Sequence, residues 1–366
     1  MNSSIQLSGM ITTVSAIDDI LELTDEETRV LQKIARIHPI RVSEYYMSLI
    51  DESDPNDPIR KMAIPSEHEL SRRGTYDTSG ERENTIIPGL QHKYRQTALL
   101  LATSECATYC RHCFRRRLVG LRSNEATCNI KRAAEYIQNH TEINNVLVTG
   151  GDPFTLSTRR INEILKTLSE IDHLDFIRFG TRTPVTYPNR ILEDRGLLTT
   201  LKAHSREQRR VYVVTQFNHP REITGRSAAA VSELLKSGVQ VNNQTVLLKG
   251  VNDNHETLAS LQNSLARIGV HPYYVFQCRP VKRVKEHFQV PLYHGYHIVE
   301  SAKKLLNGHS KRFRYIMSHP TGKIEVVGIY EDHFIFKYHQ AKYDRDQGRI
   351  FMRAVAENAT WLDDLS

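Results

Sequence analysis

Three cysteines share one short stretch of the chain. Residues 103–117 read TSECATYCRHCFRRR and place Cys106, Cys110 and Cys113 in the spacing C-x3-C-x2-C. Three thiolates on one loop can hold a single inorganic centre, and sulfur ligands of this kind suit zinc or an iron–sulfur cluster. A cube of four irons held by only three cysteines leaves its fourth iron open for another ligand. The spacing therefore predicts a metal centre in this loop.

The rest of the chain offers few partners for a closed zinc site. Such a site needs a fourth ligand, usually from a second close pair of residues, whereas Cys128 and Cys278 are isolated in the sequence. His112 is nearer, but its position between Cys110 and Cys113 is awkward for one tetrahedron. We therefore favour an iron–sulfur cluster, with a zinc loop or three structural cysteines as the alternative.

Length and composition describe a globular enzyme. The chain has 366 residues, of which 39% are hydrophobic and 25% charged, enough to bury a sizeable core. No apolar run is long enough to cross a membrane, and the N-terminal stretch lacks the charge pattern of a signal peptide. Few cysteines, three of them clustered, fit a reducing compartment. We expect a cytoplasmic enzyme with no membrane partner.

The balance of charges is basic, with a net charge of +7. A basic surface can indicate nucleic-acid binding, but these residues are dispersed and the one tight run is Arg115-Arg116-Arg117 beside the cysteines. A site for small anionic groups explains that run more economically. Nucleic acid is the less favoured partner.

Alternating strands and helices are expected to position these residues. Short apolar runs that alternate with amphipathic helices favour a parallel sheet with crossover helices. Strands are predicted at 97–103, 144–150, 175–181, 210–217, 239–248 and 271–278. Helices are predicted at 124–139, 157–171, 188–204, 226–237, 255–268 and 292–306. Six such units are too few for a closed eight-unit barrel, so we predict an α/β fold with a partial (βα)6 barrel.

Two smaller segments flank this barrel. Residues 1–92 are predicted to be an N-terminal helical and loop segment, with a helix start at Thr24 and a second helix at 42–50. The Pro- and Asp-rich part that follows is expected to wrap over another part of the fold. The predicted boundaries place the barrel at 93–308 and a C-terminal extension of short strands at 309–366.

Further polar motifs follow the predicted strands. Ligands of parallel α/β folds gather at the carboxyl ends of the strands. Candidates at that end are Gly150, Gly151, Asp152, His219 and Gln244. Paired glycines allow backbone amides to approach a ligand closely. A lone histidine is more often structural, but the place of His219 after a strand makes it a candidate.

The cysteine spacing resembles that of the radical S-adenosylmethionine superfamily. Several further stretches, in the same order, are similar to the lysine 2,3-aminomutase family over roughly residues 57–323. They read GLQHKYRQTALLLATSECATYCRHCFRRR, TGGDP, RFGTRTPV, QFNHPREIT, NNQTVLLKGVND and HPYYVFQC. The resemblance implies a radical-SAM partial barrel, a [4Fe–4S] cluster, S-adenosylmethionine and pyridoxal 5′-phosphate. It also implies movement of an amino group from Cα to Cβ by way of a 5′-deoxyadenosyl radical.

The resemblance also assigns roles to residues. The three cysteines would hold the cluster, and the glycine motif with His219 and Gln244 would bind S-adenosylmethionine. Lys323 would form the Schiff base with pyridoxal phosphate, although this chain keeps only Gly322 of the glycine run that precedes that lysine in the family. Lys93 and Tyr94 match residues beside the phosphate and ring.

Substrate recognition departs from the family's lysine-specific pattern. Arg115 matches the arginine that binds the substrate α-carboxylate, for which a guanidinium is well suited. Two carboxylates hold the distant ammonium of lysine in that pattern, and Arg279 and Ile316 stand in their places here. We therefore expect free lysine to be a poor substrate and the far end of the substrate to carry a carboxylate, as in glutamate-type aminomutases, or another acceptor group, unless Arg279 pairs with an acid such as Glu325.

Other readings remain open at this stage. A radical enzyme that modifies RNA or a protein would keep the cluster and change the substrate, and a zinc-dependent nucleic-acid module would lack iron. A β-lysine-forming enzyme that serves a translation factor conflicts with Arg279. Expected partners are an amino acid, an electron donor such as flavodoxin or ferredoxin, and a second copy of the chain.

Overall fold

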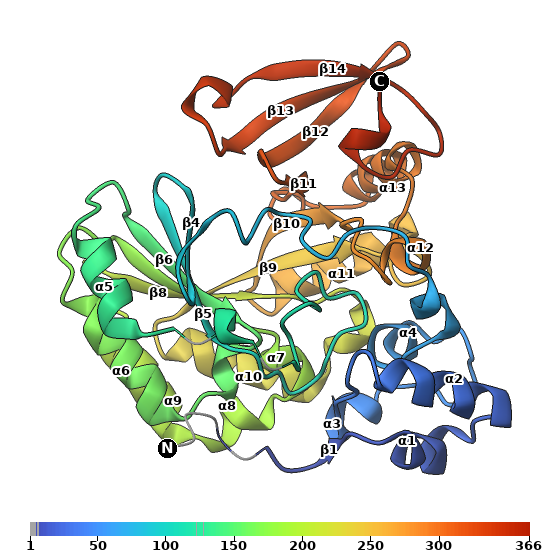
Figure 1. Ribbon diagram of the computed structural model, residues 1–366, viewed down its shortest axis with the longest axis horizontal. Coiled ribbons are helices and arrows are strands. Elements are labelled where there is room, and N and C mark those ends of the chain that lie inside the picture. Colours follow the sequence, from blue (N-terminus) through green and yellow to red (C-terminus); the bar gives the residue numbers. More distant parts are fainter. Residues whose placement is uncertain (1–4, 6, 122, 127) are drawn as a thin grey trace.

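One continuous twelve-stranded sheet runs through most of the protein. The computed structural model describes residues 5, 7–121, 123–126 and 128–366 (Figure 1). The sheet's strands follow chain order from β3 at one edge to β14 at the other. They are β3 (Thr85–Ile87), β4 (Leu90–Tyr94), β5 (Thr97–Thr103), β6 (Asn145–Gly150), β7 (Phe176–Gly180), β8 (Arg210–Thr215), β9 (Gln240–Leu247), β10 (His271–Gln277), β11 (Arg314–His319), β12 (Gly322–Tyr330), β13 (His333–Ala341) and β14 (Ile350–Ala354).

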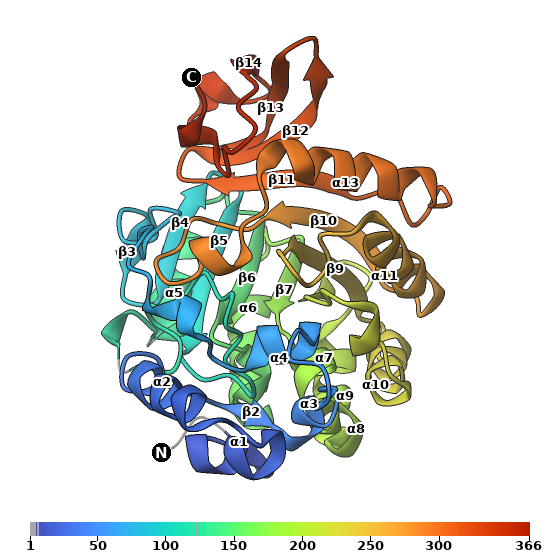
Figure 2. The same ribbon diagram turned by 90° about the vertical axis from the view of Figure 1, so that its right-hand side faces the viewer.

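The centre of this sheet is the predicted partial barrel. Strands β5 to β10 are the six predicted strands, and each pairs in parallel with the next. Crossover helices lie outside the strands, as α10 and α11 do in Figure 2. The helices after β5 are α5 (Ile130–Gln138), α6 (Thr158–Ser169), α7 (Thr183–Thr186), α8 (Asn189–Glu193), α9 (Arg195–His204), α10 (Gly225–Lys236), α11 (His255–Arg267), α12 (Lys285–Phe288) and α13 (Leu292–Lys304). The α/β architecture is confirmed.

Helix α6 shows why these segments fold as they do. Ser157 caps its first turn by accepting a hydrogen bond from the backbone N–H of Arg160. The helix buries an apolar stripe against the sheet at Ile161, Ile164, Leu165 and Leu168. Side chains three and four residues apart lie on one face of a helix, so this spacing covers the strands continuously.

Two predicted helices are interrupted. The segment 188–204 forms α8 and then α9, because Asp194 leaves the helical conformation and caps α9 through the N–H of Leu197. The segment 124–139 holds a 3₁₀ turn at Asn124–Ala126 before α5, and its residue 127 lies outside the described residues.

The N-terminal segment forms a small helical layer. It contains β1 (Met10–Ile11), α1 (Val14–Leu21), α2 (Asp25–Ala35), β2 (Val42–Ser43), α3 (Glu44–Met47) and α4 (Pro58–Ala63). The predicted helix start at Thr24 is confirmed by a complete capping box with Glu27. The predicted helix at 42–50 is shorter, because Val42 and Ser43 pair with β1 before α3 begins.

Both ends of the barrel sheet continue into flanking strands. On one side β3 and β4 add antiparallel strands to β5, and the predicted boundary at 92/93 falls inside β4. On the other side β11 pairs in parallel with β10, and β12 to β14 follow antiparallel. The extension at the top of Figure 1 thus shares the barrel's sheet. The three-part division of the chain stays a prediction. No helix among the described residues is long and apolar enough to span a membrane.

Candidate active site

A single cavity of about 470 Å³ collects nearly all predicted site residues. It lies where the strands β5 to β10 end, and β4, β11 and β12 add side chains to it. Its lining includes Lys93, Tyr94, Cys106, Cys110, Cys113, Arg115, Gly150, Gly151, Asp152, Gln244, Arg279 and Lys323. Residues that are more than 200 positions apart in the sequence therefore share one space.

The three cysteines are partly buried and line the cavity together. Burial raises the pKa of Cys106 far above its ordinary value and that of Cys113 to about 11, and the neighbouring cysteines add to both shifts. Such thiols stay protonated unless a positive centre compensates the thiolate charge. Three sulfur donors around a cavity fit an iron–sulfur cluster with one open iron.

The paired glycines bring the loop after β6 against the cysteine loop. A Cβ on Gly150, whose φ is +122°, would lie 2.4 Å from the carbonyl oxygen of Thr103. A Cβ on Gly151 would lie 2.4 Å from the carbonyl oxygen of Glu105. The N–H of Gly151 instead donates to Thr103 O at 2.6 Å. Both positions require glycine, and both line the cavity next to the cysteines.

Asp152 joins this loop to the one after β7. Its carboxylate accepts hydrogen bonds from Thr181 Oγ1 at 2.6 Å, the N–H of Arg182 at 2.7 Å and the N–H of Phe154 at 3.0 Å. Burial raises its pKa, and these donors oppose the rise. The carboxylate thus fixes two cavity loops relative to each other.

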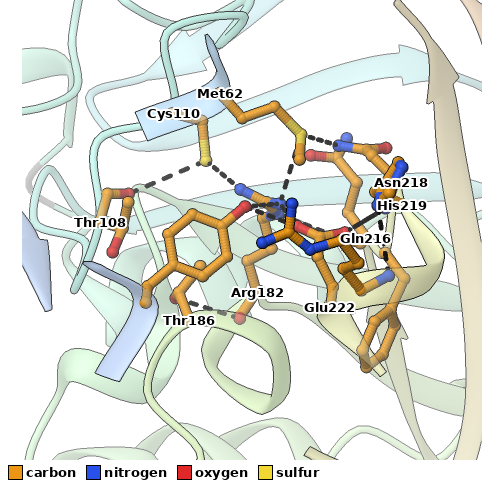
Figure 3. A network of polar contacts seen from close by, with 12 residues as sticks. Met62, Thr108, Cys110, Arg182, Thr186, Gln216, Asn218, His219 and Glu222 are labelled. Carbon is orange, nitrogen blue, oxygen red and sulfur yellow. Dashed lines mark hydrogen bonds and ion pairs between the residues drawn. The ribbon is translucent and has the colours of Figure 1, made fainter. Parts of the chain in front are cut away.

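The end of β8 presents a different residue from the one predicted. His219 lies outside the cavity lining, and its Nδ1 accepts a hydrogen bond from the N–H of Arg221. The strand ends at Thr215, so its alternation does not reach His219. Gln216 (labelled in Figure 3) lines the cavity instead. Its Oε1 lies 3.3 Å from Nε2 of His112. The sequence signal that points to Gln216 is its position directly after the strand β8.

Lys323 is the second residue of β12 and enters the cavity from the C-terminal extension. Its Nζ lies 5.6 Å from the ring centroid of Tyr94 and 5.1 Å from that of Tyr274. Burial, followed by the charges of Arg178 and Arg279, lowers its pKa to about 7. A neutral amine between aromatic rings fits the attachment of pyridoxal phosphate.

Gly322, the glycine directly before Lys323, is required by the pairing of two strands. A Cβ on Gly322 would lie 2.4 Å from the carbonyl oxygen of Gln340, so the glycine allows β12 and β13 to pair at this point. Gln340 also lines the cavity. The lysine is therefore held on a strand rather than on a mobile glycine loop.

Lys93 and Tyr94 lie on β4, opposite Lys323. Nζ of Lys93 donates to the carbonyl oxygen of His319 at 2.7 Å. Burial and the nearby charges of Arg279, Lys342 and Lys323 lower its pKa to about 7. Tyr94 is buried, which raises its pKa. The pair gives this part of the cavity a cation-and-ring arrangement suited to a phosphorylated aromatic cofactor.

Arg115 is positioned by an acid that the sequence did not single out. Its Nε donates to Glu81 Oε1 at 2.7 Å and one NH group donates to Thr149 Oγ1 at 3.1 Å. Glu81 itself is buried, yet Arg115 and Arg117 hold its pKa below the ordinary value. Glu81 therefore orients Arg115 toward the cavity and balances part of its charge.

Arg279 has a free donor at the cavity. One NH group donates to Ser318 Oγ at 2.7 Å and the guanidinium lies 4.0 Å from the ring centroid of Phe114. The other NH group is buried and has no hydrogen-bond partner among the described residues. Burial lowers the pKa of Arg279 to about 10, so it stays a cation at neutral pH.

The alternative pairing of Arg279 with Glu325 is not observed. Glu325 lies 3.5 Å from Arg314, and Arg279 bonds Ser318 instead. Ile316 is fully buried outside the cavity lining, whereas Ser318, two residues along the same face of β11, lines it. At the cavity, Arg279 is therefore paired with the hydroxyl of Ser318 rather than with a carboxylate.

Comparison with known proteins agrees with this geometry. Residues 100–261 match the family model described as the radical SAM superfamily. A putative L-lysine 2,3-aminomutase of Aquifex aeolicus is 42% identical over 94% of this chain and 92% of that protein. The L-lysine 2,3-aminomutase of Clostridium subterminale is 38% identical over 84% and 72%. The glutamate 2,3-aminomutase of Clostridioides difficile is 38% identical over 87% and 74%.

The family match covers most of the chain, and three clustered cysteines and Lys323 line the same cavity. The chain belongs to the lysine 2,3-aminomutase family of radical S-adenosylmethionine enzymes.

Proposed function

We propose that this isomerase moves the α-amino group of an amino acid with a carboxylate side chain, of the glutamate class, to its Cβ. The observation that carries the proposal is the buried, unpartnered NH group of Arg279 at the cavity. A buried cationic donor without a partner is costly, and a carboxylate satisfies both its charge and its hydrogen bond.

The charges around the cavity favour the same class of substrate. Arg279 lies beside Lys93, whose pKa it helps to lower, and no carboxylate among the described residues bonds to it. Glu81 and Asp152 also line the cavity, but Glu81 is bonded to Arg115 and Arg117, and Asp152 is bonded to the loop after β7. The ammonium of a lysine side chain would therefore meet Arg279 without a free counter-ion beside it. Like charges in a buried site cost several kcal/mol, about the amount needed to exclude a competing substrate.

Each part of the cavity has a separate task. When bound, the [4Fe–4S] cluster with S-adenosylmethionine supplies a carbon radical that removes a Cβ hydrogen, and pyridoxal phosphate carries the migrating nitrogen. Cys106, Cys110 and Cys113 would hold the cluster, and Lys323 would hold pyridoxal phosphate. Arg115 would bind the α-carboxylate and Arg279 the side-chain carboxylate, so that the substrate is fixed at both ends.

The proposal includes an electron donor and a compartment. A cluster held by three thiolates needs one electron from outside the chain, and flavodoxin or ferredoxin is the class of protein that delivers it. Clustered free cysteines of this kind persist in the reducing cytoplasm. Assays with a chemical reductant separate this partner from the substrate question.

The test compares glutamate with lysine in the native protein and in Arg279→Asp. The native protein is expected to convert glutamate and to leave lysine unchanged. Loss of a buried charge partner costs about 2–5 kcal/mol, so the variant should lose at least about 30-fold of its kcat/KM for glutamate. Arg314→Asp, which changes an arginine outside the cavity, is the matched control. Conversion of lysine but not glutamate by the native protein would refute the proposal.

A further inference from the structure

A buried ion pair lies directly behind one of the predicted cluster ligands. One NH group of Arg182 donates to Sγ of Cys110 at 2.7 Å. The other NH group bonds to Glu222 and also donates to Tyr46 Oη at 3.1 Å. Figure 3 shows the guanidinium of Arg182 between the sulfur of Cys110 and the side chain of Glu222.

The pair is held rigidly on all sides. Nε of Arg182 donates to the carbonyl oxygen of Gln216 at 2.8 Å, and its backbone N–H donates to Asp152. Glu222 is fully buried and accepts from Tyr46 Oη at 2.6 Å and from the N–H of His219 at 3.0 Å. Neither charge can turn away from the sulfur without losing several hydrogen bonds.

Burial makes these two charges effective at the sulfur. The side chain of Arg182 is 10% exposed and that of Glu222 is 0% exposed, so water and salt screen them little. A cationic hydrogen-bond donor on a thiolate withdraws electron density from the metal it binds, and such bonds to sulfur tune the potentials of iron–sulfur clusters. An anion in the same place has the opposite effect.

We propose that Arg182 and Glu222 are positioning residues that set the reduction potential of the cluster held by Cys110, with Arg182 raising it and Glu222 lowering it. A reduced cluster carries one more negative charge than an oxidised one. The guanidinium stabilises that extra charge and the carboxylate opposes it. The inference rests on the family's cluster and is independent of which amino acid is the substrate.

A purely structural role makes a different prediction. If the pair only fixed the loops, removing either member would loosen the site in the same way, and the two potentials would move together or not at all. Opposite shifts for the two members require an electrostatic effect on the cluster. The potential is therefore the measurement that separates the two roles.

The test is an anaerobic redox titration of the reconstituted full-length protein, followed by the electron paramagnetic resonance signal of the reduced cluster and without any amino acid present. Arg182→Gln should shift the midpoint potential to a more negative value, and Glu222→Gln should shift it to a more positive value. Arg190→Gln is the control, because Arg190 is a buried arginine like Arg182, is paired with the partly exposed Asp194 and lies outside the cavity lining. It should leave the potential unchanged.

Equal potentials in all four proteins, or shifts of Arg182→Gln and Glu222→Gln in the same direction, would overturn the proposal. Where Arg182→Gln fails to retain iron, Glu222→Gln decides alone: a positive shift supports the proposal, and a negative shift or none refutes it. Because the titration contains no substrate, an error in the assignment of glutamate does not affect its result.

Discussion

Lys323 has the properties of a nucleophile rather than of an ordinary lysine. It lies in the cavity between two aromatic rings, and burial is the main reason why its pKa falls to about 7. A neutral amine can attack an aldehyde, whereas an ammonium cannot. Packing removes the amine of Lys323 from water, and this desolvation gives it the reactivity that the family's chemistry requires.

Replacement of Lys323 by alanine should abolish covalent attachment of pyridoxal phosphate. Borohydride reduction of the loaded protein, followed by peptide mass spectrometry, should place the adduct on Lys323 in the native chain and nowhere in the variant. Lys337→Ala, on the exposed face of β13, should retain the full adduct. An adduct that persists in Lys323→Ala would show that another lysine is the attachment site.

The rate of pyridoxal phosphate uptake should rise with pH around a midpoint near 7. Burial and Arg178 favour the neutral amine of Lys323, so its pKa in the folded chain is about 7 rather than the ordinary 10.5. The unfolded chain keeps this proton up to a higher pH than the folded chain does. The free energy of unfolding of the apoprotein should therefore rise as the pH increases from about 7 to 10.5. Arg178→Gln removes one positive charge and should move the midpoint to higher pH. A midpoint that stays in place would contradict the role given to Arg178.

Single residues were predictable where their spacing or type is unusual. The three cysteines, the paired glycines and Arg279 stand out in the sequence, and all line the cavity. His219 and Glu81 show the limit. His219 was chosen for its place after a strand, but the strand ends at Thr215 and the side chain of His219 caps the following turn by accepting from the N–H of Arg221. Glu81 comes from a loop, and only the folded chain brings it to Arg115.

At the scale of elements, two loops must touch for the site to form. Gly151 lies so close to the cysteine loop that a Cβ would clash with backbone rather than with a flexible side chain. A backbone atom cannot be displaced cheaply, so the loop after β6 and the cysteine loop act as one unit. Through this contact the paired glycines support the cysteine loop and, with it, any cofactor that binds beside that loop.

Gly151→Ala should therefore lower iron retention after reconstitution and destabilise the fold by about 1–3 kcal/mol. Gly225→Ala is the matched control, because Gly225 begins α10 and a Cβ there has nothing within 4 Å. That variant should keep its iron and be as stable as the native chain or slightly more so. Equal iron contents in both variants would mean that the two loops can separate without loss of the cluster.

The elements themselves followed from apolar periodicity where they are long and buried. The six barrel strands and the stripe of α6 were predicted in place. Strand β4 was missed because its sequence, LQHKY, is half polar, and two of its polar side chains, Gln91 and Lys93, line the cavity. The break at Asp194 was missed because a cap inside a helical pattern looks like one more polar position.

At the scale of the whole molecule, the N-terminal segment supports the cysteine loop. Glu69 is 1% exposed and bonds Arg111 at 2.6 and 2.7 Å and also Arg116. Burial opposes its ionisation, yet the two arginines lower its pKa to about 2. The segment that was expected to wrap over the fold therefore does so through a buried ionic contact with the loop that carries Cys110 and Cys113.

Glu69→Gln should destabilise the protein by about 3–5 kcal/mol, because it leaves two arginines without a buried counter-ion. Glu67→Gln, at an exposed position two residues away, should change the free energy of unfolding by less than about 0.5 kcal/mol. The native contact should also weaken as the pH falls below about 4.5 toward 2, where Glu69 takes up its proton. Denaturant unfolding at pH 7 and pH 4 measures both effects, and equal stabilities of the two variants would contradict the account.

Long-range partnerships of this kind could not be predicted from the sequence. The contacts of Glu69 with Arg111, of Arg182 with Glu222 and of Arg279 with Ser318 each span roughly 40 residues. Their members come from separate elements, and no local pattern shows which charges will meet. The continuation of the barrel sheet into β11 and beyond is equally a property of the complete fold.

The most direct test of the central claim follows the nitrogen atom itself. The anaerobically reconstituted protein, with S-adenosylmethionine, pyridoxal phosphate and a chemical reductant, would be given ¹⁵N-labelled glutamate and, separately, ¹⁵N-labelled lysine. The account predicts that nuclear magnetic resonance finds the label moved from Cα to Cβ in glutamate and unmoved in lysine. Migration in lysine alone, or formation of 5′-deoxyadenosine with no migration in either amino acid, would contradict it.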